Sequence, residues 1–320
     1  MTVHTVPRVL VTGASGFIGR RVVQRFANEG FPVVAVSRAP ARSLPAGVVG
    51  AVVHELSGET SWRDLLRGVG VVIHCAAHVP GVGERPEVSD VRYQRVNVEG
   101  TKALAAQAAE AGVHRFVFLS SIKIHGHSTE PGHAFDERSP IAPADAYGRS
   151  KAAAEEVLQR VVATTVMAPV ILRPPLVYGA GVKGNLAALI RWIRRGLPLP
   201  LGAVHENRRS LIAVENLVDA IRHGVDHPGA AGQAFVVSDG EDLSTAALLR
   251  ALGRVVGRPT RLIPLPPVLI RATATLAGQS AVAMRLLGSL QVESSRIRSA
   301  MGWHPPLTVE EGLRRMVAHR

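Results

Sequence analysis

Short runs rich in valine and isoleucine alternate with longer segments of helical periodicity along the first half of the chain. The runs predict buried strands at residues 8–12, 32–36, 49–54, 71–75, 116–120 and 170–173. Apolar residues at helical spacing predict helices at residues 17–28, 61–67, 88–111 and 147–163. Repeated strand–helix alternation is typical of an α/β fold with a doubly wound parallel sheet and helices on both of its faces.

The pattern loosens after Pro174, where prolines mark several loops. Helices are predicted at residues 185–195, 215–225 and 243–256, strands at 208–214 and 234–238, and a mostly helical tail at 264–320. We therefore expect a first domain at residues 1–174 and a smaller mixed α/β lobe at residues 175–320. Some segments of the second part are expected to return to the first.

Composition excludes a largely disordered chain, because 47% of the 320 residues are hydrophobic and only 19% are charged. Lysine and arginine (37) exceed aspartate and glutamate (25), which gives a net charge of +12 and raises nucleic acid as a partner. No run of five like charges and no zinc-finger spacing supports that role, and aromatic residues make up only 4%. An arginine-rich surface and a phosphate-bearing small ligand are the preferred interpretations, with no nucleic-acid partner.

A single cysteine, Cys75, excludes a disulfide scaffold. The N-terminal residues lack the apolar region of a signal peptide, and no apolar run reaches the ~18 residues of a membrane span. Residues 262–290 are apolar but are flanked or interrupted by Arg261, Arg271 and Arg285. They predict amphipathic helices that pack on the body, with membrane contact as the alternative. We expect a soluble, cytoplasmic protein with no membrane partner.

The first predicted strand ends in a glycine turn that opens a helix, Gly13-Ala14-Ser15-Gly16-Phe17-Ile18-Gly19. In such turns the first glycine permits the tight turn, the second lets a pyrophosphate approach the backbone, and the third allows close packing of helix and strand. The helix N-terminus supplies N–H donors and positive potential. Because the turn lies on the first strand of a βαβ unit, it predicts a dinucleotide cofactor that contacts Gly13, Ser15, Gly16, Phe17, Ile18 and Gly19.

The ends of the next two strands bear on which dinucleotide binds. An NAD site usually has an acidic residue after the second strand, where this chain has Ser37 and Arg38. A hydroxyl and a cation suit a 2′-phosphate, so NADP is favoured, with NAD as the alternative. Glu55 and Leu56 follow the third strand, where an acidic residue can accept from the adenine amino group.

Tyr147 and Lys151 project from one face of a predicted helix. A phenol with an ordinary pKa near 10 exchanges protons poorly at neutral pH. A nearby ammonium, together with a positive nicotinamide, favours the phenolate and lowers that pKa. Ser121 follows the strand at 116–120, at the edge of the sheet where ligands bind. These three residues predict a site that polarises a substrate oxygen during hydride transfer.

Together these residues resemble the extended short-chain dehydrogenase/reductase superfamily over the whole chain. The further motifs that carry the resemblance are His74-Cys75-Ala76-Ala77, Val96-Asn97-Val98-Glu99-Gly100-Thr101, Arg173-Pro174-Pro175-x-x-Tyr178-Gly179 and the segment from Arg209 to Leu217. Ser120-Ser121-Ile122-Lys123-Ile124 and three later strings look closest to the UDP-glucose 4-epimerase-like group. That group includes reductases of UDP-4-keto-6-deoxy-N-acetylhexosamines.

The resemblance implies roles for residues in both parts of the chain. It makes Ser121, Tyr147 and Lys151 the catalytic residues, and residues 1–174 an NAD(P)-binding Rossmann domain. It adds Ala76, Ala77, Asn97 and Pro174 to the cofactor site. Lys123, Asn185 and Arg209 would bind a nucleotide-diphosphate sugar in the lobe at residues 175–320. It also implies a homodimer that packs through the alanine-rich helices.

Two departures from the family pattern bear on the reaction. The usual tyrosine after the catalytic serine is His125, and the usual acidic residue after the second strand is Ser37. The second departure favours exchangeable NADPH and net reduction of a C4 ketone. The alternative is 4-epimerisation with tightly bound NAD, and a remote alternative is a non-catalytic dinucleotide sensor. The histidines (His74 with His78, or His125 with His127 and His133) match no zinc signature, so no metal is expected.

Overall fold

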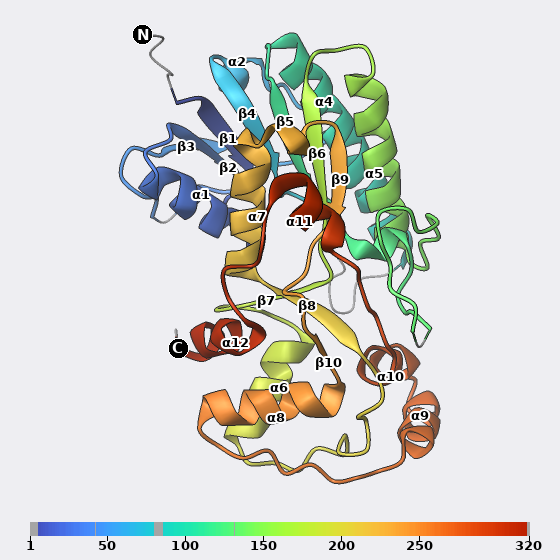
Figure 1. Ribbon diagram of the computed structural model, residues 1–320. Coiled ribbons are helices and arrows are strands. Elements are labelled where there is room, and N and C mark those ends of the chain that lie inside the picture. The colour runs from blue at the N-terminus through green and yellow to red at the C-terminus, as the bar shows by residue number, and fades with distance from the viewer. Residues whose placement is uncertain (1–5, 42, 80–85, 131, 319–320) are drawn as a thin grey trace.

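The structure is a computed structural model that describes residues 6–41, 43–79, 86–130 and 132–318. Seven strands form one sheet in the order β3-β2-β1-β4-β5-β6-β9 (Figure 1). They are β1 (Arg8–Thr12), β2 (Val33–Ser37), β3 (Val49–Val52), β4 (Val69–His74), β5 (Arg115–Leu119), β6 (Ala168–Arg173) and β9 (Gln233–Val236). Every neighbouring pair is parallel, so the predicted α/β doubly wound fold is confirmed. The strand order reverses between β1 and β4, where such sheets bind ligands.

Helices cover both faces of this sheet. Because side chains alternate along a strand, Val9 and Val11 of β1 point to one face and Leu10 to the other. The first face packs against α1 (Gly19–Asn28), α7 (Val214–Asp226) and α11 (Ser295–Met301). The second packs against α2 (Arg63–Leu66), α4 (Gly100–Glu110) and α5 (Ala146–Val162). Both faces are buried, which explains why the strands are continuous apolar runs.

The single helix predicted at residues 88–111 is divided in the structure. It consists of α3 (Pro86–Arg92), a π-helix η1 (Tyr93–Glu99) and α4. A π-helix has i→i+5 hydrogen bonds and more residues per turn, so the faces of α3 and α4 are offset in a way that one helical period over residues 88–111 does not represent. Such wide turns occur frequently at functional sites, and this one contains Asn97.

A smaller lobe lies below the carboxyl ends of the strands (Figure 1). Its sheet has the order β10-β8-β7, formed by β10 (Asp242–Leu243), β8 (Arg209–Ala213) and β7 (Leu176–Tyr178). Around it lie α6 (Asn185–Arg194), α8 (Thr245–Val256), α9 (Pro267–Leu276), α10 (Ser280–Leu287) and α12 (Val309–Ala318). The lobe has an apolar core of its own, which includes Tyr178, Ile190, Leu249 and Leu313.

The chain returns to the large sheet after residue 174. Strand β9 pairs with β6, and α7 and α11 cover one face of the sheet. Short helices η2 (Ile122–Ile124) and η3 (Pro228–Ala230) connect larger elements. The division into two domains at residue 174 stays a prediction. No helix of the described ranges is long and apolar enough to cross a bilayer.

Candidate active site

The glycine turn lies between β1 and α1, against the loop that follows β4. Gly13 has a φ of +67°, and a Cβ there would lie 2.8 Å from the backbone nitrogen of Ala76. Gly16 donates its N–H to the Gly13 carbonyl at 2.8 Å. No side chain among the described residues caps α1, and in its first turn the Arg20 and Arg21 N–H groups donate to the Gly16 and Ile18 carbonyls. This cradle of bare backbone fits the pyrophosphate of a dinucleotide.

The predicted ribose and adenine residues have partners within the chain. Ser37 is buried, and its hydroxyl donates to the Ala39 carbonyl at 2.6 Å, whereas Arg38 is exposed. The Glu55 carboxylate lies 3.2 Å from the Arg95 guanidinium, and both side chains are about half exposed. The Ser37 hydroxyl is thus already used, which leaves Arg38 as the cation open to a 2′-phosphate.

A pocket of about 160 Å³ brings the predicted catalytic residues together with cofactor residues. Its lining is Ile18, Cys75, Ala77, Val79, Leu119, Ser120, Ser121, Tyr147, Lys151, Pro174, Pro175 and Val177. These residues come from the ends of β4, β5 and β6, from β7, from the start of α1 and from the first turns of α5. Ser121, Tyr147 and Lys151 therefore meet at the carboxyl edge of the sheet, as their sequence positions imply.

The first turn of α5 is fastened to η2, which carries the residues after Ser121. Asp145 caps α5 by accepting from the Gly148 N–H at 2.7 Å, and it accepts from the Lys123 ammonium at 2.6 Å. A Cβ at Gly148 would lie 2.5 Å from the Lys123 carbonyl oxygen, so only glycine permits this approach. Lys123, expected to bind substrate, is thus paired with the cap of α5 and fixes the spacing of Ser121 and Tyr147.

Burial dominates the electrostatics of Lys151. It lowers the pKa of Lys151 to about 7, against the opposite effects of the Glu155 carboxylate and of Cys75. The ammonium lies 4.0 Å from the centre of the Phe118 ring, which partly offsets the lost hydration. This lysine consequently changes its charge near neutral pH instead of far above it.

The Tyr147 phenol differs from the sequence expectation. Burial raises the pKa of Tyr147, and the nearby Asp145 carboxylate and Tyr93 raise it further. The protein by itself therefore favours the neutral phenol. The lower Tyr147 pKa that the sequence led us to expect therefore requires positive charge, from a bound oxidised nicotinamide together with protonated Lys151.

Replacing Lys151 by methionine is expected to stabilise the fold by about 1–3 kcal/mol near pH 6. The folded pKa of about 7 is below the ordinary 10.5. Below pH 7 the wild type thus carries the full cost of a buried ammonium, and this cost disappears as pH rises towards 10.5. Urea unfolding at about pH 6 and pH 9 should show a smaller advantage at the higher pH. Lys102→Met, on the exposed side of α4, is the control, and an equal effect in both variants would refute the assignment.

A buried ion pair behind Lys151 was not found from sequence. The Arg173 guanidinium donates to the Glu155 carboxylate at 2.6 and 3.1 Å, and both side chains are only 9% exposed. Ser120 donates to the same carboxylate, and Arg173 also contacts a His125 ring nitrogen at 3.2 Å. Tyr147, Lys151 and Glu155 follow one another at intervals of four residues and so share one face of α5. This spacing was the sequence signal from which Glu155 could have been predicted near the site.

Asn97 joins three segments around the pocket. Its side-chain amide donates to the His78 carbonyl at 3.0 Å and to the Ser150 hydroxyl at 2.9 Å, and its oxygen accepts from the His78 N–H at 2.7 Å. The loop after β4 is thereby tied to α5. Asn97 thus holds the loop after β4 and helix α5 together next to the pocket. Its direct contact with a cofactor stays a prediction.

Two of the histidines considered for a metal, His74 and His125, bond to other groups of the chain. His74 contacts the Thr12 and Thr101 hydroxyls at 2.6 and 3.0 Å, and burial lowers its pKa to about 3. His125 contacts the Pro140 carbonyl at 3.0 Å as well as Arg173. Within the described ranges, no three metal-ligating side chains lie close enough to hold an ion.

The predicted substrate residues lie in the lobe. Asn185 begins α6 and is exposed, and Arg209 begins β8 and is half-buried. Burial lowers the pKa of Arg209, and the nearby positive charge of Arg285 lowers it further. The Arg209 guanidinium donates to the Gly288 carbonyl at 3.0 Å. Their contact with a diphosphate stays a prediction.

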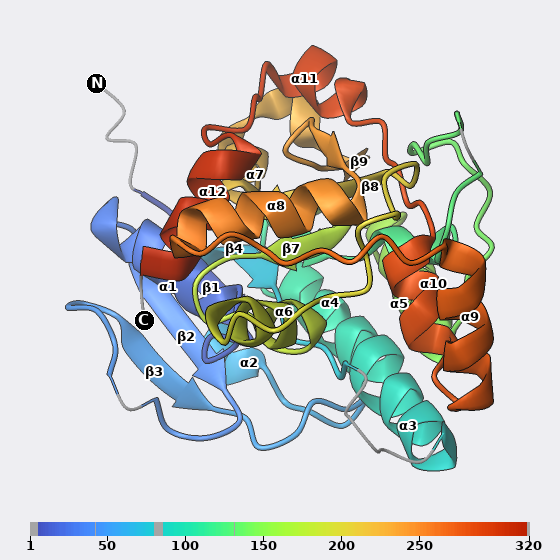
Figure 2. The ribbon, with the colours of Figure 1, turned by 90° about the horizontal axis from the view of Figure 1, so that it is seen from below.

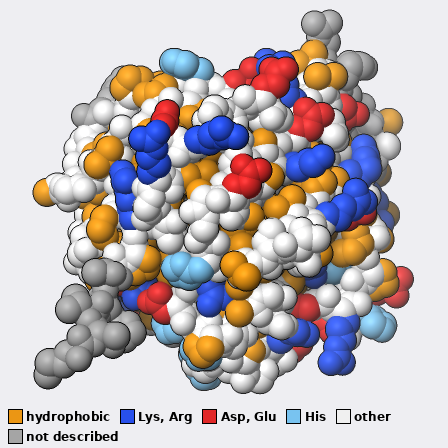
Figure 3. Space-filling view, turned by 90° about the horizontal axis from the view of Figure 1, so that it is seen from above, with side chains coloured by type: hydrophobic (Ala, Val, Ile, Leu, Met, Phe, Trp, Pro, Cys, Tyr) orange, Lys and Arg blue, Asp and Glu red, His pale blue; other side chains and the backbone are white. Residues whose placement is uncertain are grey.

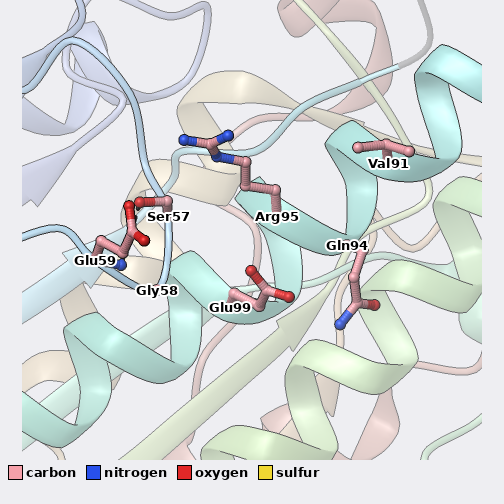
Figure 4. Close-up of a pocket in the computed structure, with 7 residues that line it drawn as sticks. All are labelled: Ser57, Gly58, Glu59, Val91, Gln94, Arg95 and Glu99. Atoms are coloured by element: carbon pink, nitrogen blue, oxygen red, sulfur yellow. Dashed lines mark hydrogen bonds between the residues drawn. The ribbon is translucent and has the colours of Figure 1, made fainter.

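A second, larger pocket of about 420 Å³ lies outside the catalytic region (Figure 4). It is lined by Ser57, Gly58, Glu59, Val91, Gln94, Arg95 and Glu99. These side chains come from the loop after β3 and from the helices before α4, and none belongs to the catalytic group. The smaller pocket, despite its size, is the one whose residues support chemistry.

Fold and site define the class of protein as an extended short-chain dehydrogenase/reductase. Residues 9–238 match the NAD dependent epimerase/dehydratase family, and the chain belongs to that family. It is 39% identical over 306 residues to a UDP-glucose 4-epimerase of Vibrio cholerae, covering 96% of this chain and 93% of that protein. It is 28% identical over 329 residues to a UDP-glucose 4-epimerase of Mycolicibacterium smegmatis, covering 97% of each chain.

Solved structures agree with the fold. A structure of MoeE5 in complex with UDP-glucose and NAD has a TM-score of 0.76, 26% identity and coverage of 98% of both chains. A UDP-N-acetylglucosamine 4-epimerase from Bacillus cereus has a TM-score of 0.79 at 18% identity, covering 98% of both chains, and supports the fold alone. The chain is thus an enzyme of the NAD-dependent epimerase/dehydratase type.

Proposed function

We propose that this enzyme interconverts the C4 epimers of a UDP-hexose, with UDP-glucose and UDP-galactose as the first pair to test. The main support is the pocket that joins Ser121, Tyr147 and Lys151 beside the glycine turn. The 39% identity to a UDP-glucose 4-epimerase along nearly the whole chain supports the choice of reaction. We thus place epimerisation before net reduction, whereas the sequence alone favoured net reduction.

The three side chains suffice for proton transfer at the sugar O4. A bound dinucleotide supplies the acceptor and donor of hydride. During oxidation Tyr147, as phenolate, takes the O4 proton while the C4 hydrogen leaves as hydride, which gives a 4-keto sugar. Ser121 hydrogen-bonds the same oxygen throughout. Return of the hydride to the opposite face of the ketone, with the proton from Tyr147, gives the epimer.

Other residues bind and orient the reactants in this proposal. Lys151 holds the ribose next to the nicotinamide and, when protonated, favours the Tyr147 phenolate. Asn185 and Arg209 bind the sugar-nucleotide diphosphate. NAD is the proposed cofactor of the epimerase, in line with the NAD bound by MoeE5.

Net reduction of a UDP-4-keto sugar with NADPH is the second candidate. The observation that favours it is exposed Arg38 directly after β2, where no carboxylate stands to bind the 2′-hydroxyl of NAD. The same three catalytic residues serve this reaction in one direction. Tyr147 then donates its proton to the developing alkoxide.

The two candidate reactions differ in whether the enzyme consumes added cofactor during turnover. We expect the purified protein to carry bound NAD, visible by native mass spectrometry, and to convert UDP-galactose to UDP-glucose without added cofactor. Steady consumption of NADPH with a 4-keto UDP-sugar, and no epimerisation, would instead support the reductase. Absence of both reactions and of dinucleotide binding would contradict both candidates.

We also propose that the enzyme acts in the cytoplasm as a homodimer that packs through α4 and α5. Both helices present small, half-buried side chains, namely Ala103, Ala106, Ala152 and Ala153. Small side chains allow the close helix approach that such an interface requires. Sedimentation equilibrium checks the mass expected for two chains.

A further inference from the structure

Helix α9 is apolar, yet none of its residues is buried. Val268 is 76% exposed, Leu276 is 90% exposed, and Leu269 is about half exposed. Ile263, just before the helix, and Met284 on α10 are also about half exposed. Together, α9 and α10 form the α9–α10 hairpin (residues 267–287), whose two helices lie side by side at the edge of the lobe (Figure 2).

The exposure follows from the helical pattern of α9. Ile270 packs against the core of the lobe. Leu269 and Leu276, separated by two turns, share another face together with Ala272 and point to solvent. A helix that is apolar on both its inner and outer faces normally has a partner on each. Within the described residues, only the inner face of α9 packs on the core.

The charge around the hairpin is one-sided. Residues 243–292 contain six exposed arginines and no aspartate, glutamate or lysine. Arg271 lies on α9, Arg285 on α10 and Arg261 just before them. By contrast, the face of the molecule opposite the lobe carries cationic and acidic side chains intermixed (Figure 3). Three of these arginines, Arg250, Arg254 and Arg258, lie on or just after α8, so the cations of the hairpin itself and its start are Arg261, Arg271 and Arg285.

We propose that the α9–α10 hairpin binds the surface of an anionic phospholipid membrane. Val268, Leu269 and Leu276 would enter the boundary between headgroups and acyl chains, while the arginines contact lipid phosphates. Residues 267–287 contain no aspartate or glutamate, so the hairpin itself adds no repulsion against an anionic surface. The hairpin binds in the plane of the surface, so the absence of a spanning helix is compatible with it. The proposal takes up the membrane contact that the sequence left as the alternative for residues 262–290, in place of the preferred expectation of no membrane partner.

The hairpin is joined to the substrate side of the lobe. Gly288, which ends α10, accepts the hydrogen bond from Arg209. Burial raises the pKa of Asp145, but its hydrogen bonds from Lys123 and Gly148 lower it below its ordinary value, and Arg285 lies close enough to lower it further. A membrane bound at the hairpin would therefore lie next to Arg209, one of the proposed substrate-binding residues.

Vesicle sedimentation tests the proposal without substrate, so its failure is separate from failure of the proposed function. The full chain should sediment with vesicles of equal parts phosphatidylcholine and phosphatidylglycerol, and much less with phosphatidylcholine alone. Val268→Asp combined with Leu276→Asp should weaken this binding at least about tenfold. Arg271→Gln should weaken it about fivefold, and added salt should reduce it further.

Val166→Asp is the matched control, because Val166 is 94% exposed on the loop between α5 and β6. This variant should bind vesicles like the wild type, and all variants should keep wild-type melting temperatures. The proposal is overturned if the wild type ignores anionic vesicles, or if the double variant binds them unchanged. It is equally overturned if the double variant loses only self-association, since the hairpin would then be an interface between two copies of this chain.

Discussion

Replacing Tyr147 by phenylalanine is expected to lower turnover by about 100- to 10,000-fold while leaving dinucleotide binding intact. The substitution removes one hydroxyl from the pocket that also contains Ser121 and Lys151. Without it, the pocket loses the group that we propose exchanges the O4 proton. The ring itself remains, so its edge contact with Tyr93, with ring centres 6.2 Å apart, is kept. Steady-state kinetics and a fluorescence titration with NAD measure the two effects.

Tyr178→Phe is the matched control for that result. The Tyr178 hydroxyl donates to Asp239 at 2.7 Å inside the lobe. Its loss should cost about 1–3 kcal/mol of unfolding free energy but leave turnover close to that of the wild type. Wild-type activity of Tyr147→Phe, or equal loss of activity in both variants, would contradict the role given to Tyr147.

Replacing Glu155 by leucine is expected to lower the free energy of unfolding by about 3–5 kcal/mol. The change leaves the Arg173 guanidinium buried without its carboxylate partner. It also removes the charge that raises the pKa of Lys151, so Lys151 should lose its proton at a lower pH and the activity profile should shift in that direction. Urea unfolding and a pH–rate profile measure the two consequences.

A double variant separates the ion pair from general disruption of the core. Glu155→Leu together with Arg173→Met removes both charges and should recover most of the lost stability. Glu156→Gln breaks only an exposed pair with Arg160 and should change stability by less than about 1 kcal/mol. If the double variant is as unstable as the sum of the single ones, the buried pair is not the cause.

The parts of the fold that are buried on both faces were predictable from sequence. The central strands β1, β2, β4, β5 and β6 are visible as short apolar runs, because each of them packs between two helical layers. The edge strand β3 is largely exposed and was predicted from its valines alone. The glycine turn was also evident, since Gly13 must adopt a positive φ against the loop after β4. Ser121, Tyr147 and Lys151 follow from strand ends and helical spacing, and they line one pocket.

What the sequence did not reveal depends on contacts between distant segments. Glu155 pairs with Arg173, and Lys123 pairs with Asp145. No local sequence pattern predicts either pair, because the partners are far apart in the sequence. The rise in the Tyr147 pKa likewise comes from burial, which composition does not give. Strands β7 and β10 are too short for a periodic signal.

Helix α9 shows the same limit in another form. Its apolar sequence predicted packing on the body, which Ile270 provides. Periodicity indicates which residues share a face but not whether a second partner covers it. The exposure of Val268 and Leu276 could therefore be found only in the structure.

The most direct test of C4 chemistry uses UDP-glucose deuterated at C4. We expect the purified enzyme, without added cofactor, to produce UDP-galactose that retains the deuterium at C4, as detected by NMR and mass spectrometry. Retention requires that hydride leaves and returns within one active site, as proposed for the pocket of Ser121, Tyr147 and Lys151. Epimerised product that has exchanged its C4 deuterium for solvent hydrogen would contradict this account, and so would failure to convert any UDP-hexose or UDP-4-keto sugar.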